Sequence, residues 1–551
     1  MQTHQDLQRT YDRGSQWRIW DLHVHTPASL IHQYPGTDPW DQFLLDLEGL
    51  PESVKVLGIN DYLFLDGYKR ILAERKQGRL KNIETVFPVI ELRIDKFGGT
   101  DGHLSRVNYH VVFSDQLSPE IIEQQFLNAL TARYKLKPGV NTPLWSGTLN
   151  RAALEDLGRK IIASVPEDKQ HQFSEPLIEG FNHLCLSQRD VVDLTESHWF
   201  KNKCLVGVGK TEWADIKWND QAVADKKTVI NDAHIVFISA TNVEHWRKAK
   251  MSLKKAAVND LLLDCSDAHY LSSSTQKDRI GKCLTWIKAD PTFEGLRHAL
   301  REPESRIAIA SEAPDEASKR ERRTKIIQEI RIVKRAGSSL TETWFENKIP
   351  LNSGLVAIIG NKGKGKSALT DTIGLLGNCK QDKYFTFLTD RTFRLGGKNS
   401  KATHFDGSIT WLDSSERTTQ LSGASEPGEH EYVKYLPQQY LERICGTVGQ
   451  TEESEFDREV KKVILSHIRP EETHNCDSLD SLIALLTKQA DENRRICKDE
   501  LHKLNERIVE VEERIDPAHR QKLEAELVRK KSELSAHQSM KPALLGACQQ
   551  L

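Results

Sequence analysis

The chain has 551 residues, of which 38% are hydrophobic and 28% are charged, with a formal net charge of −2. One hydrophobic core rarely supports this length, so we expect about two to four structural units. No run of about 18 apolar residues is present, which excludes an integral membrane protein of the helical class. The polar N-terminus predicts no signal peptide, so we expect a cytoplasmic protein.

Cysteine spacing gives no sign of a metal hook or a disulfide framework. The nine cysteines are scattered and contain no C-x-x-C pair. This pattern predicts free thiols, as is usual inside cells. Because the net charge is close to zero, any binding of nucleic acid must depend on local basic patches.

Residues 1–305 alternate short apolar runs with longer segments of helical character. The runs are rich in β-branched residues, which is typical of strands. They are Trp20–His25, Val54–Asp61, Val86–Leu92, Tyr109–Phe113, Leu205–Val208, Ile235–Ser239 and Leu261–Ser266. Because the intervening segments are long enough for crossover helices, the pattern predicts parallel strands in an open α/β sheet or a barrel.

Histidines and acids gather at or in these predicted strands. His23 and His25 are two residues apart, so both point to the same side of the first strand. Asp267 and His269 repeat this spacing after the last strand. The other candidate ligands between them are Asp61, Glu91 and His110. Ligands often lie at strand ends of an α/β barrel, and this donor set suits Zn²⁺, Mn²⁺ or Fe²⁺.

Residues 338–470 contain a phosphate-binding loop of the form G-x-x-x-x-G-K-[ST]. The apolar run Leu355–Ile359 predicts a strand before the loop, and an amphipathic helix is expected to begin at Ser367. Backbone N–H groups of such a loop bind phosphate oxygens, while its lysine meets the β- and γ-phosphates and its hydroxyl binds Mg²⁺. The residues expected to bind ATP with Mg²⁺ are Gly360, Asn361, Gly363, Gly365, Lys366 and Ser367.

Two further strands are predicted at Ser408–Leu412 and Tyr432–Leu436. Gln438 and Gln439 follow the second, and either one resembles the Q-loop glutamine of ABC-type ATPases, which reaches the metal and the attacking water. Neither a Walker B pattern nor an L-S-G-G-Q signature follows the loop. We therefore expect this chain to bind nucleotide, but not to hydrolyse it alone.

Within the C-terminal residues 471–551, the segment 478–536 is rich in Glu, Lys, Arg and Leu. A seam at spacings of 3, 4, 3 and 4 predicts a coiled coil, with a single long surface helix as the alternative. The seam residues are Leu501, Leu504, Ile508, Val511 and Ile515, and Leu523, Leu527, Lys530 and Leu534 resume it after Asp516–Pro517. The charged stretch 306–337 is interpreted as a linker, or alternatively as a contact to phosphate groups.

The motifs in this order resemble the PHP family, the polymerase and histidinol-phosphatase metallophosphoesterases, in bacterial PHP–ATPase fusion proteins. The segments that carry the resemblance are WDLHVHTPAS, INDYLFLDGY, VNYHVVFS, CSDAH, WIKADPTFEGL and GLVAIIG. It implies a distorted (β/α)7 barrel at 1–305, a linker at 306–337, an SMC/Rad50-like ABC-type ATPase N-lobe at 338–470 and a coiled-coil arm at 471–551. The second ATPase lobe is then either truncated from this chain or supplied by another.

The resemblance also implies a ligand set for the barrel. It assigns metal ligation to His23, His25, Glu91, His110, Asp267 and His269. Glu91 would bridge two metals, and Asp267 would act as ligand or base. Tyr62 stands where the family has a histidine, so one or two metals are expected rather than three. Glu212 is a further candidate for the site, and Arg93, Lys96 and Lys210 are candidates for phosphate binding.

Three functions are compatible with these motifs. The favoured one is an ATP-gated, metal-dependent phosphoesterase, a hydrolase that acts on nucleic acid in repair or genome defence. The second is a phosphoesterase that acts on small nucleotides. The third is a non-catalytic PHP module on an ATP-dependent, SMC-like clamp. Self-association or a second chain is expected in each case, and no membrane partner is expected.

Overall fold

The computed structural model describes residues 13–100, 103–134, 145–218, 222–341, 347–445 and 455–548. The chain divides into two compact units, Met1–Cys379 with Phe387–Val433, and Lys380–Thr386 with Lys434–Leu551. Within the described ranges, no helix is both long and apolar enough to cross a bilayer.

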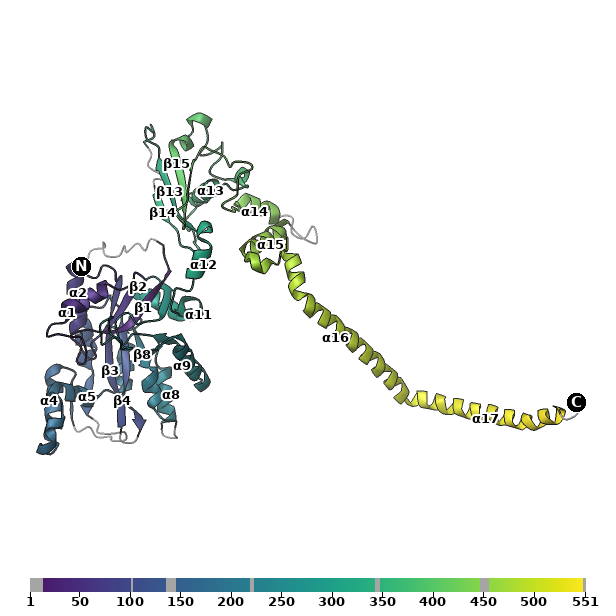
Figure 1. The fold of residues 1–551 in the computed structure, drawn as a ribbon, viewed down its shortest axis with the longest axis horizontal. Helices are drawn as coiled ribbons and strands as arrows, with labels where there is room; N and C mark the ends of the chain where they lie inside the picture. The colour runs from purple at the N-terminus through teal and green to yellow at the C-terminus, as the bar shows by residue number, and fades with distance from the viewer. Residues whose placement is uncertain are drawn as a thin grey trace. The chain divides into compact units, whose positions relative to one another are not determined.

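A nine-stranded mixed sheet forms the first part of the first unit (Figure 1). Its strand order is β10-β9-β8-β4-β3-β2-β1-β11-β12. The strands are β1 (Gln16–His25), β2 (Val54–Asn60), β3 (Thr85–Thr100), β4 (His103–Phe113), β8 (Cys204–Gly209), β9 (Ile235–Ile238), β10 (Leu262–Asp264), β11 (Thr285–Ala289) and β12 (Ile307–Ile309). Every strand predicted in residues 1–305 is present, but β3 ends eight residues after the predicted Leu92 and β4 begins six residues before the predicted Tyr109.

The sheet returns on itself and forms a nearly closed barrel. Val24, near the end of β1, makes a parallel bridge to Ala268, which follows β10. His25 N donates to Ala268 O at 3.1 Å. The strands from β1 through β4, together with β8, β9 and β10, therefore surround one interior, while β11 and β12 extend the sheet from the first half of β1.

The barrel is mixed, so the prediction of parallel strands joined by helices is confirmed for two groups of strands and is wrong for β4. β1, β2 and β3 run parallel, and so do β8, β9 and β10, but β4 is antiparallel to both of its neighbours. No crossover helix separates β3 from β4. Leu92 and Ile94 are buried at alternate positions, and this period of two continues β3 beyond its predicted end.

Two cores hold the barrel together. Helix side chains such as Phe43 and Ile71 pack with outward-facing strand residues in the larger core. The smaller core fills the interior with residues such as Trp20, Phe87 and Leu263, and α10 joins it. The helices of this part are α1 (Trp40–Glu48), α2 (Asp66–Lys76), α3 (Pro119–Gln125), α4 (Arg151–Ala163), α5 (Pro176–His183), α6 (Gln188–Thr195), α7 (Lys210–Asp215), α8 (Val223–Asn231), α9 (Val243–Ala256), α10 (Phe293–Arg301) and α11 (Pro303–Arg306).

A small three-stranded sheet lies in the excursion between β4 and β8. Its order is β6-β5-β7, and its strands are β5 (Thr131–Tyr134), β6 (Ser146–Thr148) and β7 (Leu184–Cys185). Leu186 N donates to Arg93 O at 2.9 Å, and Asp95 N donates to Leu186 O at 2.8 Å. This excursion therefore rests against β3 and brings α5 toward the barrel.

A separate antiparallel sheet of order β14-β13-β15-β16 contains the predicted strand Ser408–Leu412 as β15. Its strands are β13 (Ile327–Lys334), β14 (Asn347–Pro350), β15 (Phe405–Trp411) and β16 (Glu416–Gln420). Helix α13 (Lys366–Leu376) follows the glycine-rich loop, one residue before its expected start. The predicted linker 306–337 contains β12, α12 (Glu316–Glu321) and β13.

Two predicted strands of this region are not formed. Leu355–Ile359 has no strand partner among the described residues, and Leu355 is 96% exposed. Tyr432–Leu436 is also not a strand, because the N–H groups of Tyr432 and Val433 donate to the Gly377 carbonyl at the end of α13. Apolar composition predicted both strands, but a strand also requires a neighbour with which to pair.

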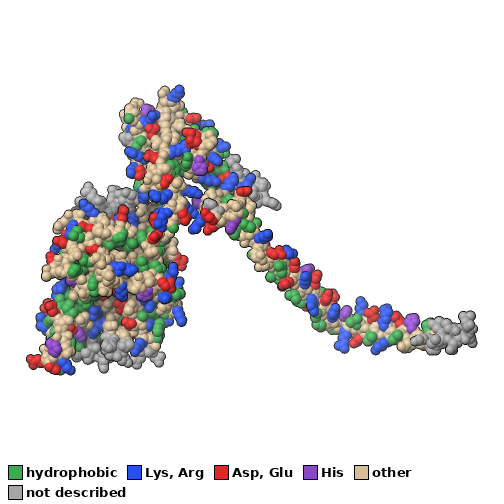
Figure 2. Space-filling model, viewed as in Figure 1, with side chains coloured by type: hydrophobic (Ala, Val, Ile, Leu, Met, Phe, Trp, Pro, Cys, Tyr) green, Lys and Arg blue, Asp and Glu red, His purple; other side chains and the backbone are tan. Residues whose placement is uncertain are grey.

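The second unit is helical and contains α14 (Gln438–Cys445), α15 (Glu455–His467), α16 (Leu479–Ile515) and α17 (Pro517–Cys548). The expected break falls at Asp516, as predicted from Asp516–Pro517. Along α16, hydrophobic side chains are exposed beside charged ones (Figure 2). Leu501, Leu504 and Ile508 are 60%, 57% and 53% exposed. The two long helices are therefore present, and pairing of the seam stays a prediction.

Candidate metal centre

A β-bulge in β1 turns two histidines into the barrel. The register between β1 and β2 passes from Asp21↔Leu57 to Val24↔Ile59, so β1 carries one extra residue there. Leu22 belongs to the interior core before the bulge, whereas Val24 belongs to the outer core after it. This change of side lets His23 and His25 face inward, with their Nε2 atoms 3.1 Å apart.

Gly58 of β2 makes room for this bulge. A Cβ atom at position 58 would lie 2.6 Å from the carbonyl carbon of Leu22 and 2.8 Å from its Cα. The backbone of β1 therefore occupies the space that any other side chain would need. Gly58 therefore fixes how closely β1 and β2 approach at Leu22, the residue before His23.

Three donors form a first group at the barrel opening, consisting of His23, His25 and Asp267. His23 Nε2 lies 3.1 Å from Asp267 Oδ1, and His25 Nε2 lies 3.5 Å from the same oxygen. Ligands placed about 2.0–2.2 Å from a tetrahedral ion lie about 3.3–3.6 Å apart. The three donors thus fit one divalent ion with a fourth position left open, as in catalytic sites.

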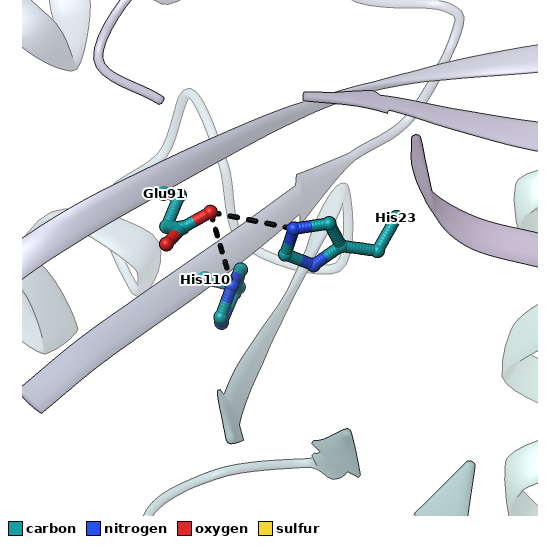
Figure 3. Close-up of side chains that lie close together, drawn as sticks. All are labelled: His23, Glu91 and His110. Carbon is teal, nitrogen blue, oxygen red and sulfur yellow. Dashed lines mark ion pairs between the residues drawn. The ribbon is translucent and has the colours of Figure 1, made fainter. Parts of the chain in front are cut away.

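A second group consists of His23, Glu91 and His110 (Figure 3). Glu91 Oε2 lies 3.3 Å from His23 Nε2 and 3.6 Å from His110 Nε2. Both ring nitrogens of His110 are buried and lack a hydrogen-bond partner. Such orphaned atoms usually meet a bound ion or water, so the donors of this group also fit a metal. Because one ring nitrogen binds one ion, His23 can serve only one of the two groups, and a second ion would depend on His110 and Glu91.

Asn60, the last residue of β2, was missed by the sequence analysis. Its Nδ2 lies 2.7 Å from Glu91 Oε2 and 2.8 Å from His23 Nε2, between two of the candidate ligands. Its Oδ1 accepts from Tyr62 N at 3.0 Å, which fixes the orientation of the amide. A polar residue that ends an otherwise apolar strand was the available signal for this position.

Asp61, a predicted ligand, lies outside both groups. Its buried carboxylate accepts from Thr26 N at 3.2 Å, Thr26 Oγ1 at 2.7 Å and Gly67 N at 2.8 Å. Burial raises the pKa of Asp61 to about 6. These contacts tie the turn after β1 to the start of α2, so Asp61 has a structural role here.

His269, also predicted as a ligand, lies outside both groups as well. Its Nδ1 lies 2.7 Å from Asp267 O, so Nδ1 carries the proton and Nε2 is the acceptor. The Tyr62 hydroxyl donates to that Nε2 at 3.1 Å. Tyr62 therefore occupies the nitrogen with which His269 would bind a metal. Tyr62 and Asp267 both have left-handed backbones, with φ of 59° and 51°, a strained conformation that often marks functional sites.

Opposite charges dominate the electrostatics of the groups. Burial acts to lower the pKa of His23, but the Asp267 and Glu91 carboxylates outweigh it and raise that pKa to about 10. Burial lowers the pKa of His25 to about 4, and the charges of the nearby His269 and His23 also lower it. The pKa values of Asp267 and Glu91 are lowered despite burial, because histidines surround both. The carboxylates are therefore ionised and paired with these histidines.

Glu212, at the start of α7, also faces this centre. Its carboxylate is folded over Gly209 at the end of β8, where a Cβ atom would collide with it. Burial raises the pKa of Glu212, and the charges of His110, Glu91 and Asp267 act on it. Glu212 is not part of either three-donor group among the described residues.

The glycine-rich loop forms a second candidate site. Gly363 and Gly365 have φ of 83° and 85°, a conformation that only glycine adopts easily. Lys366 Nζ donates to Gly360 O at 2.7 Å and to Asn361 O at 3.0 Å, so the lysine folds back over the loop. Ser367 lies in the first turn of α13. In the other unit, Gln438 and Gln439 begin α14, and Gln438 Nε2 donates to Glu442 Oε1 at 2.8 Å.

Comparison of the chain with known protein families finds no match, and comparison with curated proteins finds none either. What the geometry establishes is a nearly closed mixed α/β barrel. Buried His, Glu and Asp groups at its opening can hold a divalent metal.

Proposed function

We propose that the barrel is a metal-dependent phosphoesterase, a hydrolase that uses one or two divalent ions. The observation that carries this proposal is the pair of overlapping three-donor groups buried at the barrel opening. Imidazole and carboxylate donors together suit Mn²⁺, Zn²⁺ or Fe²⁺. Such ions, when bound, supply Lewis-acid activation of water and neutralise phosphate charge.

Each donor has a distinct part in this proposal. His25 and Asp267 would hold one ion with His23, while His110 and Glu91 would hold the other. Glu91 has two oxygens and is the residue able to bridge both ions. The side chain of Asp267 is 42% exposed, whereas those of His23 and Glu91 are almost fully buried. A substrate would therefore approach from the side of Asp267, and Asp267 would be the best placed base only where its carboxylate does not bind an ion.

Nucleic acid is our favoured substrate, in repair or genome defence. Its support is the combination of a phosphoesterase with a phosphate-binding loop and long helices, an argument from architecture rather than from the site. Hydrolysis of small nucleotides is the second candidate, because the donor groups suit any phosphate ester. The displaced His269, held by Tyr62, favours the third candidate, a non-catalytic module on an ATP-dependent clamp.

We further propose that Gly360–Ser367 binds ATP with Mg²⁺, and that Gln438 or Gln439 senses it. Positive φ at the glycines supports a phosphate cradle. A second lobe, from another chain or from a longer polypeptide, would pair with Leu355–Ile359. Support for this is the exposure of that apolar segment, whose backbone has no strand partner among the described residues.

Elemental analysis beside a hydrolysis assay tests the metal proposal. Wild type is expected to hold about one or two Mn, Zn or Fe ions per chain and to hydrolyse bis(p-nitrophenyl) phosphate. The double variant His23→Ala/His25→Ala loses both properties. A matched variant, His171→Ala/His245→Ala, removes two exposed histidines outside the groups and keeps both. A wild type that stays metal-free after supplementation would rule the proposal out.

The choice of substrate needs a second comparison. Cleavage of single-stranded or linear DNA with little release from free nucleotides supports the first candidate, and the reverse supports the second. Metal content without hydrolysis of any ester supports the third. For the loop, Lys366→Ala is expected to weaken binding of a fluorescent ATP analogue at least about tenfold, without changing metal content. Equal nucleotide affinity in wild type and Lys366→Ala would contradict that assignment.

A further inference from the structure

Arg93 lies on the same face of β3 as Glu91. The pairing with β4 is regular from Val89↔Val112 through Arg93↔Asn108, so residues two apart point to the same side. Glu91 faces the barrel interior among the metal donors. Arg93 therefore enters the same opening one step further along the strand.

The surroundings of Arg93 fix its guanidinium but do not neutralise it. Its Cζ lies 4.0 Å from the centre of the Phe181 ring, and Nη1 donates to Asn182 Oδ1 at 3.2 Å. Both contacts come from α5. Nε is buried and has no hydrogen-bond partner. In the part of the chain that the structure describes, no carboxylate lies within ion-pair distance of Arg93.

A largely buried cation without a counter-ion is an expensive feature. Burial lowers the pKa of Arg93, yet an arginine keeps its charge in proteins. Glu91 is the carboxylate whose charge acts on Arg93, but that carboxylate is engaged with His23 and His110. A buried charge of this kind needs an anion that is not a side chain of these surroundings.

The other two candidate cations are engaged elsewhere. Lys96 Nζ forms an ion pair with Asp225 at 2.8 Å. Lys210 Nζ lies 5.5 Å from the centre of the Trp213 ring, in a cation–π arrangement. Of these three cations, Arg93 alone has both a free hydrogen-bonding edge and a place on the face of β3 that carries Glu91. That edge consists of Nε and Nη2, which can donate to two oxygens of one phosphate side by side.

We propose that Arg93 is the anion-recognition residue of the barrel, and that it binds two oxygens of the substrate phosphate through its Nε and Nη2 edge. The proposal rests on the phosphoesterase function above and adds how the substrate is held. Phe181 and Asn182 act as positioning residues, since they hold the plane of the guanidinium toward the donors. The ligand class is a phosphate mono- or diester, and inorganic phosphate is its smallest probe.

Binding of inorganic phosphate to the metal-loaded full chain tests this directly. Arg93→Met is expected to weaken phosphate binding by about 10- to 100-fold in calorimetry, with metal content unchanged. KM for bis(p-nitrophenyl) phosphate rises by a similar factor, and kcat falls less. Lys96→Met is the matched control and keeps the phosphate affinity of wild type. Arg93→Lys keeps the charge without the fork, so it is expected to recover only part of the affinity.

The outcomes separate this proposal from the phosphoesterase function. If wild type hydrolyses esters while Arg93→Met and Arg93→Lys bind phosphate as tightly as wild type, the Arg93 proposal is wrong and the function stands. If wild type hydrolyses nothing but binds phosphate in an Arg93-dependent way, the anion site stands and the function fails. Should Arg93→Met not fold, Arg93→Lys with phosphate affinity equal to wild type overturns the proposal by itself.

Discussion

The bulge that turns His23 and His25 inward depends on a single glycine, and Gly58→Ala tests that dependence. The new Cβ atom would lie 2.6 Å from the Leu22 carbonyl carbon, whereas ordinary contacts begin at 3.4 Å. β1 and β2 must therefore separate by about 1 Å at this point, or the bulge must move. Backbone on both sides makes the strain hard to relieve, since no flexible side chain can turn away.

We expect Gly58→Ala to lower the free energy of unfolding by about 3 kcal/mol, the upper range for overpacking. Urea unfolding of the metal-free protein measures this. Metal affinity falls as well, because a displacement of about 1 Å at Leu22 is passed to the adjacent His23. Measuring metal content at limiting metal therefore reports on the bulge separately from overall stability.

Gly49→Ala is the matched control for this substitution. The nearest atoms to its Cβ would be Leu45 O at 3.4 Å and Asp46 O at 3.6 Å, which are ordinary contacts. Its φ of −80° suits alanine, so the change is expected to be neutral or to stabilise by about 0.4–1 kcal/mol. If Gly58→Ala unfolds at the same urea concentration as Gly49→Ala and retains its metal, the reasoning from the bulge is refuted.

Three further predictions concern other parts of the chain. Tyr62→His places an imidazole beside His269 and is expected to raise the amount of bound metal by about one ion per chain. Tyr62→Phe is the control and leaves the amount of bound metal unchanged. Equal metal content in the two variants would contradict this prediction. Burial raises the pKa of Asp264 to about 7. The protonated carboxyl group therefore contributes its full stabilisation below about pH 4, and this contribution is lost as the pH rises through 7. The stability advantage of wild type over Asp264→Asn should thus shrink by at most about 4 kcal/mol between pH 4 and 8, and a constant difference in urea unfolding would disprove it. Ile508→Glu on the α16 seam is expected to reduce self-association in analytical ultracentrifugation, while Val509→Glu, similarly exposed but off the seam, serves as its control.

The strands of the barrel could be read from the sequence because each carries a local signal. Runs such as Val54–Asp61 and Ile235–Ser239 are apolar and β-branched over a strand's length. The direction of β4 could not be read in the same way. Nothing local distinguishes a hairpin from a crossover in residues 93–108, and only the alternating burial of Leu92 and Ile94 reveals the extended ribbon.

The candidate site shows the same division. The spacing of His23 and His25 predicted their shared side, and the structure places Glu91, His110 and Asp267 beside them. Asp61 and His269 carry the same residue types at strand ends, yet Thr26 and Tyr62 engage them instead. Which polar atom meets which depends on contacts between distant segments, and the sequence pattern does not record these contacts.

Leu355–Ile359 has the apolar composition of a strand, but it has no partner strand among the described residues. Four apolar side chains of this run are exposed, from 37% for Ile358 to 96% for Leu355. Burial of each would contribute about 1.5–3 kcal/mol, so together they favour association by roughly 6–12 kcal/mol before its entropic cost. The run directly precedes the glycine-rich loop, so pairing it would also fix the first residue of that loop, Gly360. On the proposal that this loop binds nucleotide, strand pairing and nucleotide binding are coupled, since each restricts the same backbone. A lobe that supplies the missing strand is therefore expected to raise nucleotide affinity, without needing to touch the nucleotide itself.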